Sequence, residues 1–400
     1  MKITKKSMRF VSILFITVTV CIAVFNIHAF SQGNIKLGPL HLAPKFTERI
    51  ESDDNIYQVS GKGTSGDKNS DIINTYTPGL GLMLPFGGEQ HAVALDWRSD
   101  FKNYRDNADQ NQQNHYFTAM GKLSLPKGFG VELLDNYEDT WETAGSETDQ
   151  LHARKTNTGA IKVSLPDYFR RFDVDFTYKN YDQEYDEFAL RRANRNEHNF
   201  TVKVPFKLTP KINIFPEYTY GFNHIDFERL DDGLSDSHWN EIFGGVEWEA
   251  TAKTTGIMKF GYTNRDFEKS TVSDVKTFSM LMGIDADLSS RTKLLINAER
   301  STQVSEFTSG SNAFVRTGGN ARISHQIKKV NAAMYGVYSK SVFRDSKRKD
   351  DDYTLGADLT YNLKKWSFID LKYSYKDKHS NFEDQSDRIN KASIGIGVKF

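Results

Sequence analysis

The chain has 400 residues, of which 38% are hydrophobic, and it combines a mean hydropathy of −0.57 with zero net charge. After the first thirty residues no apolar run reaches the ~18 residues that a spanning helix needs, so a bundle of transmembrane helices is excluded. Neutrality gives no reason to expect nucleic acid as a partner. The aromatic content, 13%, suits a membrane β-barrel, whose outer wall carries aromatic girdles at both membrane surfaces.

Residues 1–31 have the features of a secretory signal peptide, with a basic start, an apolar stretch over Phe10–Ala29 and small residues at its end. The alternative is a single uncleaved membrane anchor. The only cysteine, Cys21, lies in this stretch, and Val20 before it does not fit a lipidation site. The mature chain is therefore expected to have no thiol, which excludes disulfides, cysteine nucleophiles and thiolate metal sites. We predict a signal peptide over 1–31 and a single barrel domain over 32–400.

From about Leu37 to the end, apolar and polar side chains alternate in segments of roughly 8–15 residues, which is typical of β-strands with two different faces. Short turns alternate strictly with long polar loops along the chain. The short turns are 86–89, 126–128, 166–168, 209–211, 251–254, 289–291, 328–329 and 364–365. The long loops are 53–71, 105–113, 143–155, 182–197, 228–237, 268–274, 302–311, 346–352 and 379–388. These connections separate about 18 strands.

The fold class that follows is all-β: a transmembrane, antiparallel, up-and-down barrel with short periplasmic turns and long extracellular loops. Single-chain bacterial barrels have even strand numbers, and an even number places both chain ends on the periplasmic side. A soluble β-sandwich would show the same alternation. Nine hairpins would make an unusually large sandwich, however, and would not account for the last residue.

That last residue is Phe400, which closes a strand whose apolar side chains, Ile394, Ile396 and Val398, fall on one face. A terminal aromatic after an alternating strand resembles the C-terminal signal of Gram-negative outer-membrane proteins. The resemblance implies that Phe400 is the membrane-insertion signal and that the barrel-insertion machinery is a partner.

Charged residues on the face opposite the apolar one are expected to line the lumen. An 18-stranded barrel is wide enough for an aqueous channel unless a loop fills it, and 53–71 and 182–197 are long enough to fold inward. The lumen candidates mix both signs, as neutral or mixed solutes such as carbohydrate would require. Three aromatic residues with the same parity, Phe215, Tyr116 and Tyr338, are candidate stacking platforms for sugars. The charged candidates are Asp96, Arg98, Lys122, Asp173, Lys179, Lys203, Glu241, Glu247, Lys259, Arg316, Arg322, Asp358 and Lys372.

No catalytic, cofactor or metal motif is found in the sequence. The ten His residues form no zinc-binding pair, and there is no nucleophile elbow or phosphate-binding glycine loop. We therefore expect neither an enzyme nor a cofactor. Acidic clusters in the predicted outer loops are candidate sites for divalent cations that bridge lipopolysaccharide: Asp53–Asp54, Asp231–Asp232 and Asp350–Asp351–Asp352. The alternative is that these are solvated loop charges with no ligand.

Residues 37–104 resemble the opening of a family of outer-membrane β-barrel porins. The likeness rests on Gly38-Pro39 and Pro44 in the first strand, on Asp54-Asn55-Ile56 after it, and on Thr77-Pro78-Gly79 in the second strand. Proteins like this are often associated with exopolysaccharide or capsule loci. The resemblance therefore implies a role in polysaccharide export or assembly, with polysaccharide as substrate and a separate periplasmic export partner.

The sequence thus predicts an outer-membrane channel of a Gram-negative bacterium, in contact with outer-membrane lipid and lipopolysaccharide and serving exopolysaccharide export through an aqueous lumen. A passive uptake porin for small sugars or nutrients is the first alternative. A closed barrel that scaffolds a secretion or electron-transfer complex is the second.

Overall fold

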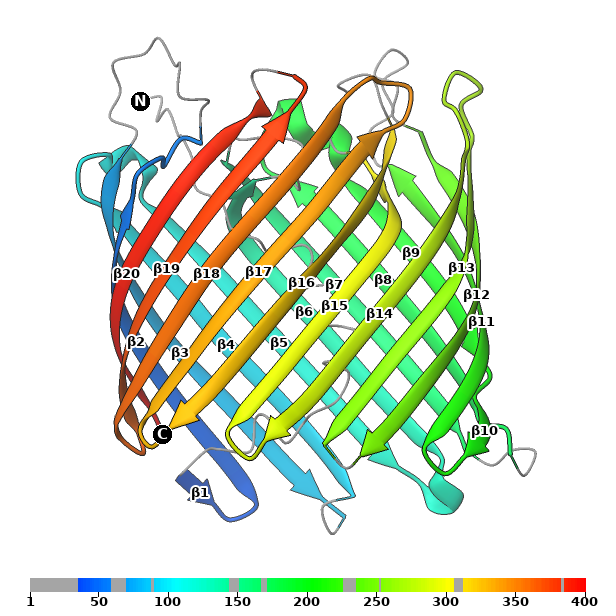
Figure 1. Cartoon of the computed structure of the whole chain (residues 1–400), viewed down its shortest axis with the longest axis horizontal. Helices are drawn as coiled ribbons and strands as arrows, with labels where there is room; N and C mark the ends of the chain where they lie inside the picture. Colours follow the sequence, from blue (N-terminus) through cyan, green and yellow to red (C-terminus); the bar gives the residue numbers. More distant parts are fainter. Residues whose placement is uncertain are drawn as a thin grey trace.

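The computed structural model describes residues 35–58, 70–87, 90–143, 151–166, 171–225, 235–251, 253–305, 312–382 and 385–400, and the predicted signal peptide lies outside them. Its strands wind around a single barrel (Figure 1). They are β1 (Ile35–Leu37), β2 (Leu40–Asp53), β3 (Asp71–Phe86), β4 (His91–Tyr104), β5 (Gln112–Ser124), β6 (Gly130–Thr143), β7 (Leu151–Leu165), β8 (Val174–Tyr185), β9 (Arg195–Lys203), β10 (Phe206–Thr209), β11 (Ile212–Ile225), β12 (Ser237–Thr251), β13 (Thr254–Phe267), β14 (Val275–Ser289), β15 (Thr292–Val304), β16 (Ala313–Ile327), β17 (Val330–Phe343), β18 (Lys349–Lys364), β19 (Ser367–Ser380) and β20 (Asp387–Lys399). Three short 3-10 helices, η2 (Ala108–Gln110), η3 (Pro126–Gly128) and η4 (Phe188–Ala193), lie between strands. In the described ranges no helix has the length and apolarity needed to cross a membrane.

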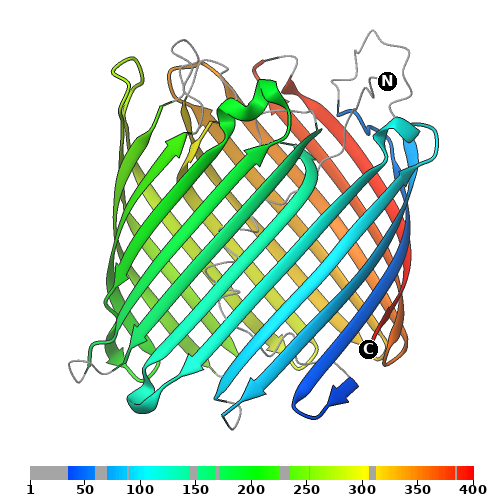
Figure 2. The same cartoon turned by 180° about the vertical axis from the view of Figure 1, so that it is seen from behind.

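The wall of the barrel has 18 strands, as the sequence predicts. β9 and β10 both pair with β11 and are two pieces of one wall strand, whereas β1 only pairs with β2 in a small hairpin. All other neighbours are antiparallel and follow one another along the chain, and β2 pairs with β20 to close the sheet. Figure 2 shows the same closed wall from behind. Closure leaves no wall strand with an unpaired edge, which a membrane requires of a β-structure.

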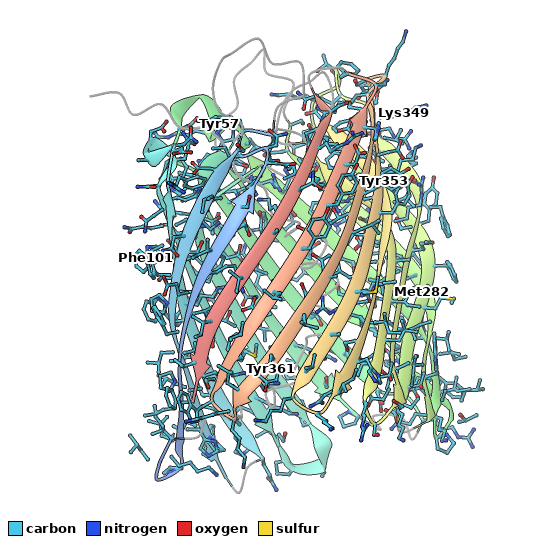
Figure 3. All side chains as sticks on the ribbon, turned by 60° about the vertical axis from the view of Figure 1, so that its left-hand side comes forward. Tyr57, Phe101, Met282, Lys349, Tyr353 and Tyr361 are labelled. Atoms are coloured by element: carbon cyan, nitrogen blue, oxygen red, sulfur yellow. The ribbon has the colours of Figure 1, made fainter. Side chains whose placement is uncertain are left out.

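The two faces of the wall differ in chemistry. Phe101 and Met282 project outward on opposite sides of the barrel (Figure 3). Large apolar side chains on the outer face of other strands are exposed, with Met334 at 68% and Ile242 at 64%. On β18 the outward face carries Tyr353 near one end and Tyr361 near the other (Figure 3), as expected of two aromatic girdles. Charged side chains gather on the inner face.

The structure departs from the sequence expectation at three places. The chain turns at Gly38, which has φ +63°, so the first wall strand begins at Leu40 and not at Leu37. The strand through Phe200 is broken at Pro205, because proline has no N–H for the ladder. Tyr338 was predicted to face inward, and this is wrong: it pairs with Gly319 and Tyr353 on the outer face and is 38% exposed.

Candidate channel lining and mouth

Ion pairs on the inner face join strands that are not neighbours. Nζ of Lys45 on β2 lies 2.7 Å from a carboxylate oxygen of Asp96 on β4, with β3 between them. The intervening strand has Gly79 opposite Lys45 and Gly81 opposite Asp96. A Cβ on Gly79 would lie 2.5 Å from Cε of Lys45, so glycine leaves the room in which this side chain crosses the strand.

The same arrangement closes the barrel seam. Arg49 on β2 donates to Asp370 on β19 at 2.8 Å, and the two residues face the same glycine, Gly395 of β20. A Cβ on Gly395 would lie 2.6 Å from the Asp370 carboxylate. This pair therefore bridges the first, last and next-to-last wall strands. Further along the wall Arg322 donates to Asp358 at 2.7 Å, and Nζ of Lys372 lies 3.9 Å from Asp370.

A second group of charges surrounds Phe215 on the part of the wall formed by β9, β11, β12 and β13. Lys203 pairs with Glu247, and Lys259 pairs with Glu217. Nζ of Lys203 lies 4.1 Å from the centre of the Phe215 ring, a cation–π contact. The group lies next to Pro205, where the ladder on β11 is interrupted between β9 and β10. It thus braces the wall where a backbone hydrogen bond is missing.

Most of the predicted lumen residues contact partners that are not themselves among the predicted lumen residues. Lys203 with Glu247 and Arg322 with Asp358 are the two pairs formed within the predicted set. Glu241 accepts a hydrogen bond from Thr263, Arg316 donates to Ser339, and Arg98 lies over the ring of Tyr116 at 4.1 Å. Strand register places Lys122 and Lys179 on the inner face with the others. Predicted residues with partners outside the set are Asp96 with Lys45, Lys259 with Glu217, Lys372 with Asp370, and Asp173 with Lys207.

Four inner-face residues that matter here were missed: Lys45, Arg49, Glu217 and Asp370. Each follows the same alternation as the predicted ones, so parity alone was enough to find them. The glycines opposite Lys45, Arg49 and Asp370 in neighbouring strands were a second signal. That the inner-face charges line the path of a solute stays a prediction.

At the extracellular end, the segment that follows β2 packs against the inner face. Ile56 and Tyr57 form a buried cluster with Ile73 of β3 and Tyr104 of β4. The Tyr57 hydroxyl donates to Asn107 at 2.6 Å. The loop 53–71 was a candidate for inward folding because of its length, and the described residues that follow β2 pack against the inner face.

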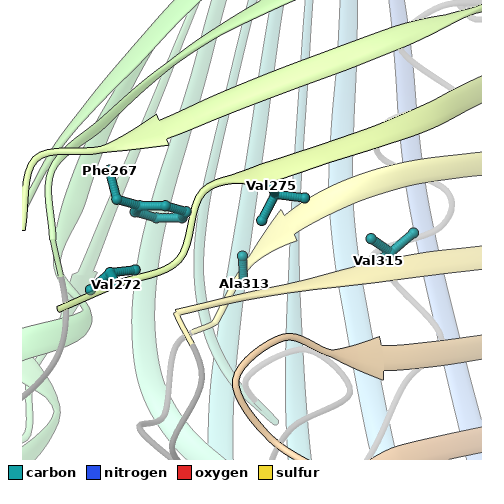
Figure 4. Close-up of a cluster of buried hydrophobic side chains, with 5 residues drawn as sticks. All are labelled: Phe267, Val272, Val275, Ala313 and Val315. Carbon is teal, nitrogen blue, oxygen red and sulfur yellow. The ribbon is translucent and has the colours of Figure 1, made fainter. Parts of the chain in front are cut away.

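The other loop that is long enough to fold inward, 182–197, also packs on the wall. Leu190 and Ala193, in the η4 segment, pack against Tyr185 at the inner face of β8. A third apolar cluster lies at the ends of β13, β14 and β16, where Val272 of the connecting loop packs with Phe267, Val275, Ala313 and Val315 (Figure 4). The described loop segments therefore lie against side chains of the wall strands.

Two of the acidic pairs that were candidate cation sites are used inside the protein. Asp53 is 1% exposed and lies 2.7 Å from Nζ of Lys391. Asp350 is fully buried and pairs with Arg348 at 2.6 Å. Asp231–Asp232 lies outside the described residues. In the part of the chain that the structure describes, no three His, Cys, Asp or Glu side chains are grouped as a metal site would require.

Comparison with known proteins gives one family and several remote structures. Residues 29–400 match the family described as "Putative beta-barrel porin 2". No curated protein matches the sequence significantly. Similar solved structures include the outer-membrane protein OpdK from Pseudomonas aeruginosa, with 7% identity and a TM-score of 0.47 over 90% of this chain and 98% of that one. A BenF-like porin from Pseudomonas fluorescens Pf-5 has 9% identity and a TM-score of 0.46 over 90% and 99% of the two chains. At these scores the likeness carries no argument about substrate.

Proposed function

The chain belongs to the family of β-barrel porins that it matches over residues 29–400, and from this membership we propose that it is a passive channel for small polar solutes. It is an outer-membrane barrel of a Gram-negative bacterium. The observation that carries the proposal is the inner face, on which charges of both signs are held in pairs such as Lys45 with Asp96 and Lys203 with Glu247. Paired charges hydrate a lumen without selecting one sign of ion.

The packing at the extracellular end of the barrel favours small solutes over polymers as the transported substrates. Ile56, Tyr57 and Leu190 pack against the inner face at the extracellular end, where they take up space that a polymer would have to cross. Exopolysaccharide export, which the sequence resemblance implied, receives no support from the family match, and we do not propose it.

Conductance of the refolded, signal-cleaved protein in planar bilayers tests the channel. We expect steady, ohmic conductance with weak preference between K⁺ and Cl⁻. Liposome swelling with a series of uncharged sugars of rising size then measures the limit of passage, and we expect monosaccharides to enter faster than pentasaccharides. A silent barrel would contradict the channel, and equal swelling rates across the series would contradict the small-solute limit.

A further inference from the structure

The outer face of β17–β20 carries a lattice of tyrosine, carboxylate and basic side chains at the extracellular end. On one row Lys340, Asp351 and His379 face one another across β17, β18 and β19. On the row below, Tyr338, Tyr353, Asp377 and Arg388 do the same across β17–β20. Tyr338 and Tyr353 stand with ring centres 5.0 Å apart.

In this lattice each carboxylate is bonded to a tyrosine hydroxyl and lies close to a basic group, and the basic groups are exposed to solvent. Asp377 accepts the Tyr375 hydroxyl at 2.9 Å and lies 3.3 Å from the Arg388 guanidinium. Asp351 accepts the Tyr338 hydroxyl at 2.8 Å and lies 3.4 Å from Lys340. The Asp377 side chain is 17% exposed, whereas that of Arg388 is 65% exposed. In both pairs the basic group is therefore more exposed than the carboxylate that holds it.

The position of the lattice identifies what these basic groups meet. Tyr338 and Tyr353 belong to the aromatic girdle, which in barrels marks the boundary between hydrocarbon and headgroups. Lys340 follows Tyr338 by one outward position, and on β18 Lys349 lies above Tyr353 on the side away from Tyr361 (Figure 3). The basic groups therefore stand at headgroup level in the outer leaflet.

The wall at β6–β8 has the opposite character at the same end. Lys155 faces Asp139 on one neighbouring strand and Glu184 on the other, and it pairs with Asp186 at 3.2 Å. This lysine is surrounded by carboxylates, so an anionic headgroup gains nothing there. The basic groups of β17–β20 thus differ from Lys155, which has a carboxylate on each neighbouring strand.

We propose that the β17–β20 face binds the phosphate groups of lipopolysaccharide, with Lys340 and Arg388 as the principal contacts and His379 and Lys349 beside them. Charge-assisted hydrogen bonds from ammonium and guanidinium groups to phosphate oxygens are among the strongest polar contacts available at a wet surface. The proposal concerns the outer wall and is independent of conduction through the lumen.

Binding of purified lipopolysaccharide to the full barrel in detergent micelles tests this. We expect the double variant Lys340→Gln/Arg388→Gln to bind about thirtyfold more weakly, since each basic group beside an anionic surface contributes several-fold in affinity. Lys155→Gln is the matched control and should leave binding unchanged. Enzymatically dephosphorylated lipopolysaccharide should bind the native protein as weakly as intact lipopolysaccharide binds the double variant.

Three results would overturn the proposal. They are equal loss in Lys155→Gln, equal binding of the dephosphorylated lipid, and full competition by millimolar inorganic phosphate, which would indicate a free-anion site. A double variant that fails to fold is replaced by Lys340→Arg/Arg388→Lys, which retains both charges and should bind within a few-fold of the native protein. Loss of binding in that conservative variant would contradict the assignment.

Discussion

Lys45 and Asp96 lie on strands that do not touch, and they meet over Gly79 of the strand between them. The Lys45–Asp96 ion pair therefore depends on Gly79, which makes no contact of its own in the pair but leaves space for the Lys45 side chain. The relationship recurs at Arg49, Gly395 and Asp370, where the first and last wall strands meet.

Replacing Gly79 with valine should destabilise the barrel. The new side chain occupies the volume of the Lys45 stem and also meets the Trp97 carbonyl, so the ion pair separates and the wall strains, at a cost of about 1–3 kcal/mol. Gly244→Val is the control, because nothing lies within 4 Å of a Cβ at that position. Urea unfolding in lipid vesicles measures both. Equal midpoints for the two variants would show that the crossing over Gly79 is unimportant.

Removing one partner of the Lys45–Asp96 pair should shift ion selectivity. Asp96→Asn leaves a lysine without its counter-charge, and Lys45→Gln leaves an aspartate, so the two variants should move the reversal potential in a KCl gradient in opposite directions. The double variant should return close to the native value. If neither single variant changed the reversal potential, these inner-face charges would not lie along the conducting path.

Arginine at position 242 should be costly because Ile242 is on the outer face and its side chain is 64% exposed there. We expect Ile242→Arg to lower the free energy of unfolding by about 2–4 kcal/mol in vesicles. Asn240→Arg, one outward position closer to the extracellular end, should cost at most about 1 kcal/mol, since the penalty falls towards the interface. A larger loss at 240 than at 242 would contradict the placement of the membrane.

Tyr57→Ala should widen the mouth. The ring contributes to the cluster with Ile73 and Tyr104, and its hydroxyl holds Asn107, so its removal frees the segment after β2 from the wall. Single-channel conductance should rise, whereas Tyr57→Phe, which retains the ring, should change it much less. Identical conductance in all three proteins would mean that this segment does not restrict the opening.

Phe400 has two separable roles, as an insertion signal and as a packing partner. Its ring stacks on Trp366 with centroids 5.7 Å apart, and its backbone N–H donates to the Pro44 carbonyl. Both Phe400→Ala and Trp366→Ala remove the stack, but only the first removes the terminal aromatic. If the signal matters, assembly in cells should fall sharply for Phe400→Ala alone. Equal losses would assign the effect to packing.

Much of the fold was predictable because a barrel wall repeats one rule. The alternation and the turns indicated the strand number, and parity placed residues such as Asp96 and Lys203 on the same face. Tyr338 was misplaced because apolar side chains occupy both faces of its strand, and a one-residue shift reverses every side chain. The partner of Asp96 was not predictable, since it depends on the register of two successive strand pairs, and no local pattern encodes that register.

The closing contact between β2 and β20 has a consequence for how the molecule is made. Arg49 and Asp370 are 321 residues apart in sequence, so the sheet remains open until nearly the whole chain is present. An incomplete chain has two free strand edges and an apolar outer face, the features that promote aggregation. A chain truncated before β20 would be expected to depend on chaperones for its solubility, and completion of the last strand is the step that ends this dependence.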